Sequence, residues 1–326
     1  MPELHLPFAA ELPALPEWLA TWPWAEAAVI AFGFAWGSLL GSFINVVVHR
    51  LPLGESVAGG GSRCPHCRCP IRARDNLPVI GWLLLRGRCR SCQAGIAPAY
   101  PLVEALCGLL VATLVATELA AGGRWLPGSS TGFPQGVDRL LRGDWHLLVT
   151  CCLHAGVVLT IVTWALLDRS DWKPQRVGSK CPRGWFMLSA GIVLAGVAIC
   201  PTAAPPGLLP GGAGWPAEPN GVQGVTASLV GMLLGSVLAQ AAGTWSVRLA
   251  LPLLGGVLGW QTLTVVAVAT ALAAEIVRFF APGRLQPGDA GLGLAVAGTA
   301  ALAWHAAVVA VWQPSGTALQ AALTTG

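Results

Sequence analysis

The chain has 326 residues, of which 54% are hydrophobic and only 10% are charged, and its formal net charge is +4. Soluble globular domains carry about 25% charged residues. A composition this poor in charge therefore excludes an ordinary water-soluble domain and indicates an integral membrane protein in contact with the lipid bilayer. The small net charge gives no sign of nucleic-acid binding, and we expect no nucleic-acid partner.

Apolar segments that approach the length of a bilayer-spanning helix recur along the chain. Such a helix needs about 20 apolar residues, and about eight segments come near that length. In chain order they are Ala25–His49, Pro101–Gly122, Trp145–Leu167, Trp185–Ala204, Val222–Trp245, Leu249–Trp260, Thr262–Phe280 and Ala290–Trp312. The sixth segment is short, and Gly259-Trp260-Gln261 separates it from the seventh. We expect a tight turn there, or one re-entrant hairpin made of both segments.

Basic residues predict how these segments cross the membrane. Met1–Pro23 has no Lys or Arg, so we expect no cleaved secretory leader. The loop at residues 50–100 holds eight of the 19 Lys and Arg, and residues 169–183 hold another group. Cytoplasmic loops are enriched in Lys and Arg. We therefore predict an all-α, polytopic transmembrane bundle, with these loops in the cytoplasm and both termini outside. Arg124, Arg139 and Arg142 are exceptions to the pattern.

The first basic loop contains two Cys-x2-Cys pairs, Cys64 with Cys67 and Cys89 with Cys92, with 21 residues between the pairs. Four thiolates on two facing turns complete a tetrahedral zinc site. A reducing cytoplasm argues against two disulfides instead. We expect a small zinc-ribbon-like domain with a structural zinc. The alternative is a packed loop with free thiols.

Several stretches of the N-terminal part resemble the bacterial prepilin peptidases, the type IV leader peptidases. In order they are Gly41–Pro52, Ser62–Cys67, Asp75–Cys92 and Tyr100–Leu106, and the resemblance covers about residues 37–110. It implies an inner-membrane aspartic-type endopeptidase that cuts the leader from type IV prepilins or pseudopilins at the cytoplasmic face. These substrates belong to type IV pilus and type II secretion systems. Many members of the family are also methyltransferases that use S-adenosylmethionine, so this cofactor is implied by the resemblance alone.

The resemblance also suggests how the chain is divided. Its expected parts are an extracytoplasmic segment (1–23), an N-terminal peptidase-type domain (24–110) with the cysteine-rich loop (50–100), a helix end and outer loop (111–144), a peptidase-type membrane domain (145–312) and a tail (313–326).

Amide hydrolysis by carboxylates needs two of them around one water, one ionised and one protonated. Asp168 ends the third apolar segment and resembles the first catalytic Asp of the family, although Pro174 follows it one residue earlier than in the family pattern. The alternative is a helix-end carboxylate paired with Arg169 or Lys173.

The second catalytic Asp of the family lies in Gly-x-Gly-Asp-Val-Lys-Leu, ahead of a helix that ends in Gly-Trp-Gln. Here Ser246-Val-Arg-Leu249 takes that place, with Ser246 at the Asp position, and Leu258-Gly-Trp-Gln261 follows. Serine cannot share a proton with Asp168 as a carboxyl group does, so the sequence does not support a two-aspartate mechanism.

Three other acids are candidate partners for Asp168: Glu275, Asp289 and Asp171. Each also has a simpler explanation. Glu275 can pair with Arg278 along its helix, Asp289 can be stabilised by the dipole at a helix N-terminus, and Asp171 can face water.

The sequence thus predicts a prepilin leader peptidase-like protein. The alternative is a catalytically degenerate member that binds pilin-like helices or an assembly partner. A third possibility, a small-solute transporter with a broken helix near Leu249–Trp260, is not supported by the N-terminal motifs.

Overall fold

The computed structural model describes residues 23–53, 55–57, 61–120, 145–169, 221–241, 244–280 and 289–303, with isolated positions at 137, 140 and 191. All the regular elements in these ranges are helices, apart from two isolated β-bridges in the loop, Arg63 with Pro70 and Arg88 with Gly95. This confirms the all-α class. The predicted segment Trp185–Ala204 lies outside the described residues except for Gly191, and the predicted helix count is therefore not tested.

Three of the described helices are long and apolar enough to cross a membrane. They are α2 (Pro23–Arg50), α4 (Ala99–Leu114) with its continuation as the π-helix η3 (Val115–Ala120), and α6 (Trp145–Asp168). Their ends agree closely with the predicted segments, because the bilayer thickness sets the length of an apolar helix.

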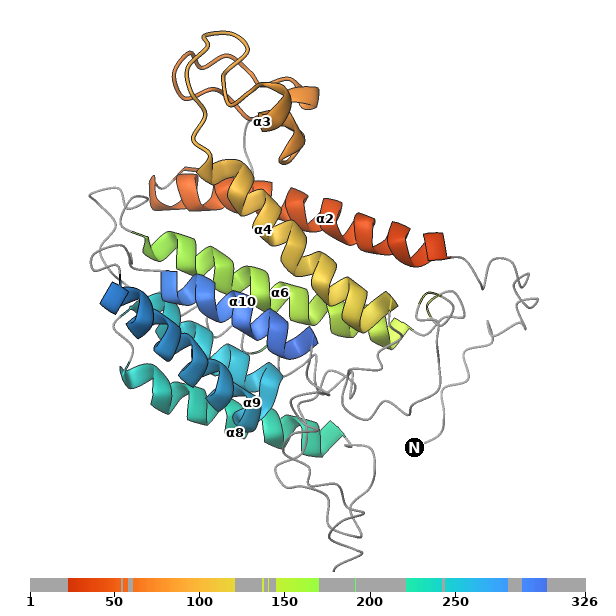
Figure 1. Cartoon of the computed structure of the whole chain (residues 1–326), viewed down its shortest axis with the longest axis vertical. Helices are drawn as coiled ribbons and strands as arrows, with labels where there is room; N and C mark the ends of the chain where they lie inside the picture. The colour runs from red at the N-terminus through yellow and green to blue at the C-terminus, as the bar shows by residue number, and fades with distance from the viewer. Residues whose placement is uncertain are drawn as a thin grey trace, which may run out of the picture.

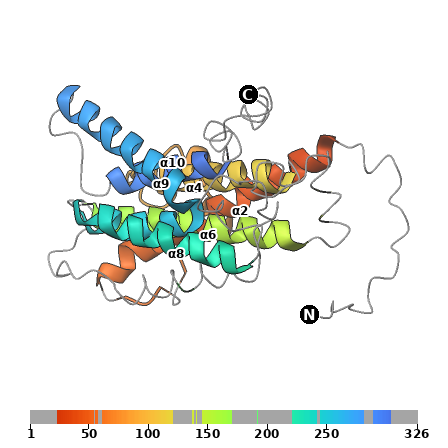
Figure 2. The same cartoon turned by 90° about the horizontal axis from the view of Figure 1, so that it is seen from below.

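The C-terminal part contains α8 (Gly221–Leu238), the short η6 (Ala239–Ala241), α9 (Trp245–Phe280) and α10 (Asp289–Ala303). The predicted turn at Gly259-Trp260-Gln261 is wrong, because α9 continues through it as one helix. Gly259 is the one glycine in this turn, and it weakens a helix by only about 1 kcal/mol relative to alanine. The later part of α9 extends away from the other helices (Figure 2).

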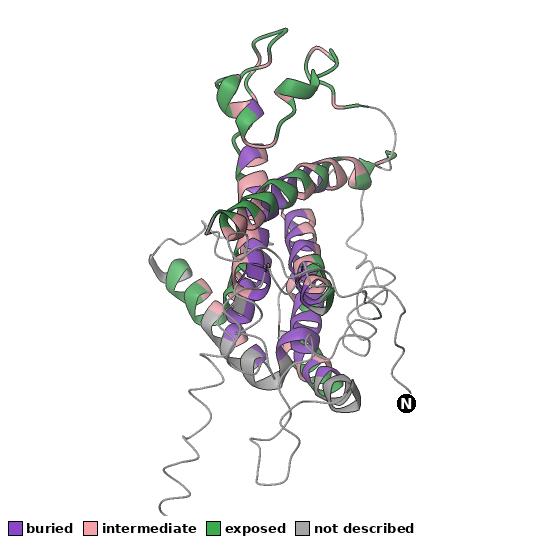
Figure 3. Ribbon diagram, turned by 90° about the vertical axis from the view of Figure 1, so that its right-hand side faces the viewer, coloured by how far each residue is buried: buried purple, intermediate pink, exposed green. Residues whose placement is uncertain are grey.

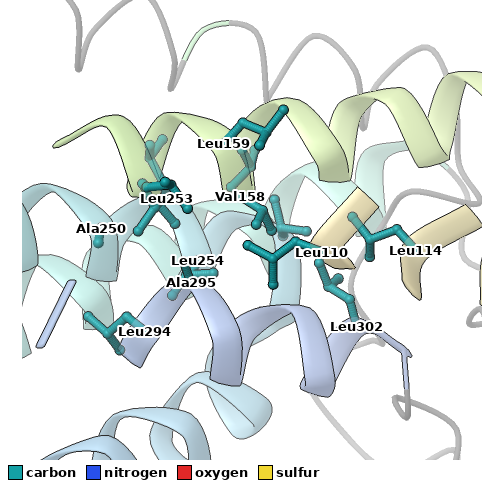
Figure 4. Close-up of a cluster of buried hydrophobic side chains, with 14 of the residues drawn as sticks. Leu110, Leu114, Val158, Leu159, Ala250, Leu253, Leu254, Leu294, Ala295 and Leu302 are labelled. Atoms are coloured by element: carbon teal, nitrogen blue, oxygen red, sulfur yellow. The ribbon is translucent and has the colours of Figure 1, made fainter. Parts of the chain in front are cut away.

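The helices form a bundle in which α6 and α10 lie side by side in the middle, between the pair α2 and α4 and the pair α8 and α9 (Figure 1). The core between them is aliphatic. Val158 of α6, Leu254 of α9 and Ala295 of α10 meet there, together with Leu110 and Leu114 of α4 (Figure 4). Close helix contacts depend on glycine: a Cβ added at Gly231 of α8 would collide with the carbonyl of Gly255 in α9.

The cysteine-rich loop joins α2 to α4 and stands out beyond the helices (Figure 1). Its short elements are η1 (Leu51–Leu53), η2 (Ala73–Asp75) and α3 (Ile80–Leu84). Buried residues concentrate in the helix bundle, whereas the loop is mostly exposed (Figure 3).

Candidate functional site

The two cysteine pairs lie on two turns of the same geometry. In the first turn the N–H of Cys64 donates to the carbonyl of Cys69 (3.0 Å), and in the second the N–H of Cys89 donates to that of Ala94 (2.8 Å). Arg68 and Gln93 occupy equivalent positions, one residue after the second cysteine, and both have a φ of 59°. This left-handed conformation closes each turn behind its two thiols.

The two turns bring four thiols together, as the sequence predicted. The Sγ atoms of Cys64, Cys67, Cys89 and Cys92 all lie within 4.8 Å of one another. His66 and Cys69, in the same turn, are exposed and not part of this group. The donor set and its closeness fit a tetrahedral metal site with four sulfur ligands.

The electrostatics of the cluster also favour a bound cation. The backbone N–H groups of Cys67 and His66 lower the pKa of the Cys64 thiol to about 6. The backbone N–H of Cys69 also lowers the pKa of Cys67, but desolvation and the neighbouring thiols outweigh it and raise that pKa to about 12. One thiolate therefore forms readily and the next does not, unless a cation compensates their repulsion.

Polar contacts fasten the loop to itself and to the membrane helices. The Arg90 guanidinium donates two hydrogen bonds to the Asp75 carboxylate (2.8 and 2.7 Å), and this contact holds the pKa of Asp75 below its usual range. The N–H of Val79, whose φ is 60°, donates to Glu104 of α4 (2.7 Å). A positive φ is unfavourable for a β-branched residue, and the Glu104 contact offsets part of that cost.

A second polar site lies where the end of α6 meets the start of α9. The hydroxyl of Ser246 donates to Oδ2 of Asp168 (2.8 Å), and the backbone N–H of Ser246 points to the same oxygen (3.4 Å). Both residues are buried, with exposures of 2% for Asp168 and 1% for Ser246. Ser246 therefore faces Asp168, at the position where the family resemblance places a second catalytic Asp.

A third helix closes this site. A Cβ added at Gly291 of α10 would lie 3.2 Å from the Ser246 hydroxyl and 2.9 Å from the Cβ of Ala165. The missing side chain at Gly291 thus lets α10 approach the Asp168–Ser246 pair.

The other candidate acids have different surroundings. Asp289 accepts a hydrogen bond from Arg169 (2.7 Å), which ties the end of α6 to the start of α10. Glu275 is exposed on α9. Asp171 and Lys173 lie outside the described residues. Among the described residues, Ser246 hydrogen-bonds to the Asp168 carboxylate, and Arg169 forms an ion pair with Asp289.

The structure also pairs two buried residues that the sequence did not bring together. Nδ1 of His154 in α6 lies 2.7 Å from Oε1 of Glu118 in η3, and both side chains are almost completely buried. The signal was available, since an ionisable residue inside a membrane segment is costly and marks a specific contact.

The chain is similar to known proteins over its N-terminal part. Residues 35–118 match the family model described as the bacterial peptidase A24 N-terminal domain. The "Prepilin leader peptidase/N-methyltransferase" of Stutzerimonas stutzeri is 43% identical over 117 residues, which cover 29% of this chain and 39% of that protein. The "Type 4 prepilin-like proteins leader peptide-processing enzyme" of Escherichia coli is 44% identical over 112 residues, which cover 28% of this chain and 42% of that protein.

The relative from Myxococcus xanthus, with the same name as the Stutzerimonas protein, is 48% identical over 79 residues, or 24% of each chain. The match thus spans about two fifths of the curated relatives' length, or less. No solved structure matches the chain. The matched residues contain the later part of α2, the cysteine-rich loop and α4, and they end before Asp168 and Ser246.

Proposed function

We propose that this chain, whose residues 35–118 belong to the prepilin peptidase family, acts on type IV prepilins or pseudopilins at the cytoplasmic face of the bacterial inner membrane. The match over this domain is the observation that carries the proposal. Residues 24–110 then form the N-terminal domain, and residues 145–312 form the membrane domain that holds Asp168. The names of both relatives favour leader cleavage, and that of the Stutzerimonas protein favours N-methylation as a second activity. The family resemblance implies S-adenosylmethionine as the methyl donor and the new N-terminus as its acceptor.

Asp168 is the carboxylate that we propose for catalysis. A carboxylate can take a proton from an attacking water, but cleavage also needs a group that donates a proton toward the substrate carbonyl. Ser246 donates its hydroxyl hydrogen to Asp168 itself, and a hydroxyl is far less acidic than a carboxyl group. A working peptidase therefore needs a further acid, for which Glu275, Asp289 and Asp171 remain the candidates.

The Asp168–Ser246 pair is also the specific observation in favour of a second function. Two catalytic carboxyl groups share one proton because their charges repel, whereas Asp168 and Ser246 form one stable hydrogen bond. A protein with this pair can retain the family's recognition of a pilin-like helix without cutting it.

One reconstituted assay tests both functions. The full-length chain is placed in lipid vesicles with a prepilin, and the products are analysed by mass spectrometry with and without S-adenosylmethionine. Cleavage by the wild type, lost in Asp168→Asn, would support the peptidase. Co-purification of uncleaved prepilin would support the binding protein. If the chain neither cleaves nor binds the prepilin, the proposed substrate class is refuted.

We also propose that Cys64, Cys67, Cys89 and Cys92 hold a structural zinc ion, which supplies four metal–thiolate bonds that fix the two turns. The bound metal then stabilises the fold of the loop, in which few apolar residues are buried, as it does in other small metal-binding domains. Elemental analysis of the purified protein tests this assignment. About one zinc per chain is expected for a tetrahedral site with four cysteine ligands, and its absence from freshly purified protein would refute it.

A further inference from the structure

The short helix α3 presents a row of aliphatic side chains to the solvent. Ile80, Leu83 and Leu84 follow the i, i+3, i+4 spacing that places side chains on one helix face. Their exposures are 55%, 59% and 70%, and Leu77, just before the helix, is also exposed. This α3 patch (Leu77, Ile80, Leu83 and Leu84) lies outside the three predicted membrane-spanning helices, so its exposure is not explained by them.

The opposite side of α3 is fixed against the rest of the loop. Gly81 is buried, and a Cβ at this position would collide with the carbonyl of Asp75. Trp82 donates its indole N–H to the carbonyl of Ile96 (3.0 Å) and lies over Gly87. The outward direction of the α3 patch is therefore set by the fold and not by a loosely placed segment.

Arginines surround the α3 patch in the sequence and are exposed in the structure. Arg72 and Arg74 precede the helix, and Arg86 and Arg88 follow it. Residues 51–98 contain seven arginines and only two acids, Glu55 and Asp75. Aliphatic side chains flanked by arginines are the combination that binds an anionic phospholipid surface, where the side chains enter the headgroup region and the charges meet phosphates.

The ends of the loop keep this patch near the bilayer. The first membrane-spanning helix ends in η1, where Leu51 and Leu53 are exposed, and the next such helix begins at Ala99. Both ends of the loop are therefore joined to helices that are long and apolar enough to cross a membrane (Figure 1). We propose that the α3 patch docks on the anionic phospholipid surface next to the bundle and holds the four-cysteine cluster at the membrane interface.

Hydrogen–deuterium exchange of the full-length protein in nanodiscs tests the docking. Exchange in residues 77–88 is compared between nanodiscs of phosphatidylcholine alone and nanodiscs that also contain phosphatidylglycerol. We expect exchange to slow about fivefold or more in the anionic nanodiscs, which corresponds to about 1 kcal/mol for one arginine near such a surface. High salt should reverse the effect, because exposed charges are screened.

Matched variants separate docking from folding. Leu83→Ser with Leu84→Ser should abolish the lipid-dependent protection, while Ile71→Ser, an exposed aliphatic residue of the same loop outside α3, should keep it. Unchanged metal content in all three proteins shows that the loop is folded. Equal exchange in both nanodiscs at low salt would overturn the proposal. Protection that requires an added prepilin peptide, or that rises with protein concentration, would overturn it in favour of a peptide site or a dimer.

Discussion

The buried pair of Glu118 and His154 makes the strongest prediction about stability. Their side chains are 0% and 3% exposed and 2.7 Å apart, and they join η3 to α6. The second polar atoms of both, Oε2 of Glu118 and Nε2 of His154, are buried and have no hydrogen-bond partner among the described residues. Each residue therefore depends on the other, because one contact supplies the polar interaction that its burial demands.

Replacing one member of the pair should lower the free energy of unfolding much more than replacing both. Removing one partner of a buried pair typically destabilises a protein by about 3–5 kcal/mol, whereas an apolar replacement of both is often neutral. We expect Glu118→Leu and His154→Leu each to lower the free energy of unfolding by about 3 kcal/mol, and the double variant by less than about 1 kcal/mol.

Reversible unfolding of the full chain in mixed micelles, followed by circular dichroism, gives the four values of this double-mutant cycle. Glu26→Leu is the control, because Glu26 is a half-buried acid in the first turn of α2 and should change stability by less than about 1 kcal/mol. The dependence of the two residues on each other would be refuted if the losses in free energy of unfolding of the two single variants add up in the double variant. It would also be refuted if each single loss is no larger than that of Glu26→Leu.

Three further predictions follow from the other sites. Zinc should bind more weakly as the pH falls, because protons compete with the ion for the four thiolates, and Cys64, whose pKa is lowered to about 6, is protonated at the lowest pH among them. A chromogenic chelator measures the release, and a zinc affinity that does not fall with pH would contradict this prediction. Ser246→Asp should place a second carboxyl group beside Asp168, so a prepilin cleavage assay should show activity gained or increased, while Ser246→Ala should gain none. Gly231→Val should separate α8 from α9 and lower the melting temperature strongly, whereas Ser236→Val, on the exposed side of α8, should change it little.

The parts that the sequence predicted well are those governed by local constraints. The ends of α2, α4 and α6 follow from the length of apolar chain that a bilayer requires. The four-cysteine cluster follows from the spacing of its residues, because each Cys-x2-Cys turn places two thiols together. Ser246 was placed opposite Asp168 by its position in a motif, and their hydrogen bond agrees with that placement.

The parts that the sequence did not predict depend on packing between distant segments. Arg169 and Asp289 are 120 residues apart, and Glu118 and His154 are 36 apart, so no local pattern pairs them. The continuity of α9 was missed for another reason. A Gly-Trp-Gln sequence resembles a turn by composition, but a membrane helix satisfies its backbone hydrogen bonds internally and tolerates one glycine better than an interruption.

Ser246, at the position where the family resemblance places a second acid, helps to hold α6, α9 and α10 together. Asp168 accepts hydrogen bonds from the hydroxyl and the backbone N–H of Ser246 at the N-terminus of α9, where a negative charge is favourable. A second carboxylate at this position would repel Asp168 unless a proton were shared between them. The serine therefore removes the source of the shared proton and adds a contact that fixes the helices. The proposed proteolysis consequently depends on a proton donor from outside the Asp168–Ser246 pair, whereas the proposed recognition of a pilin-like helix does not.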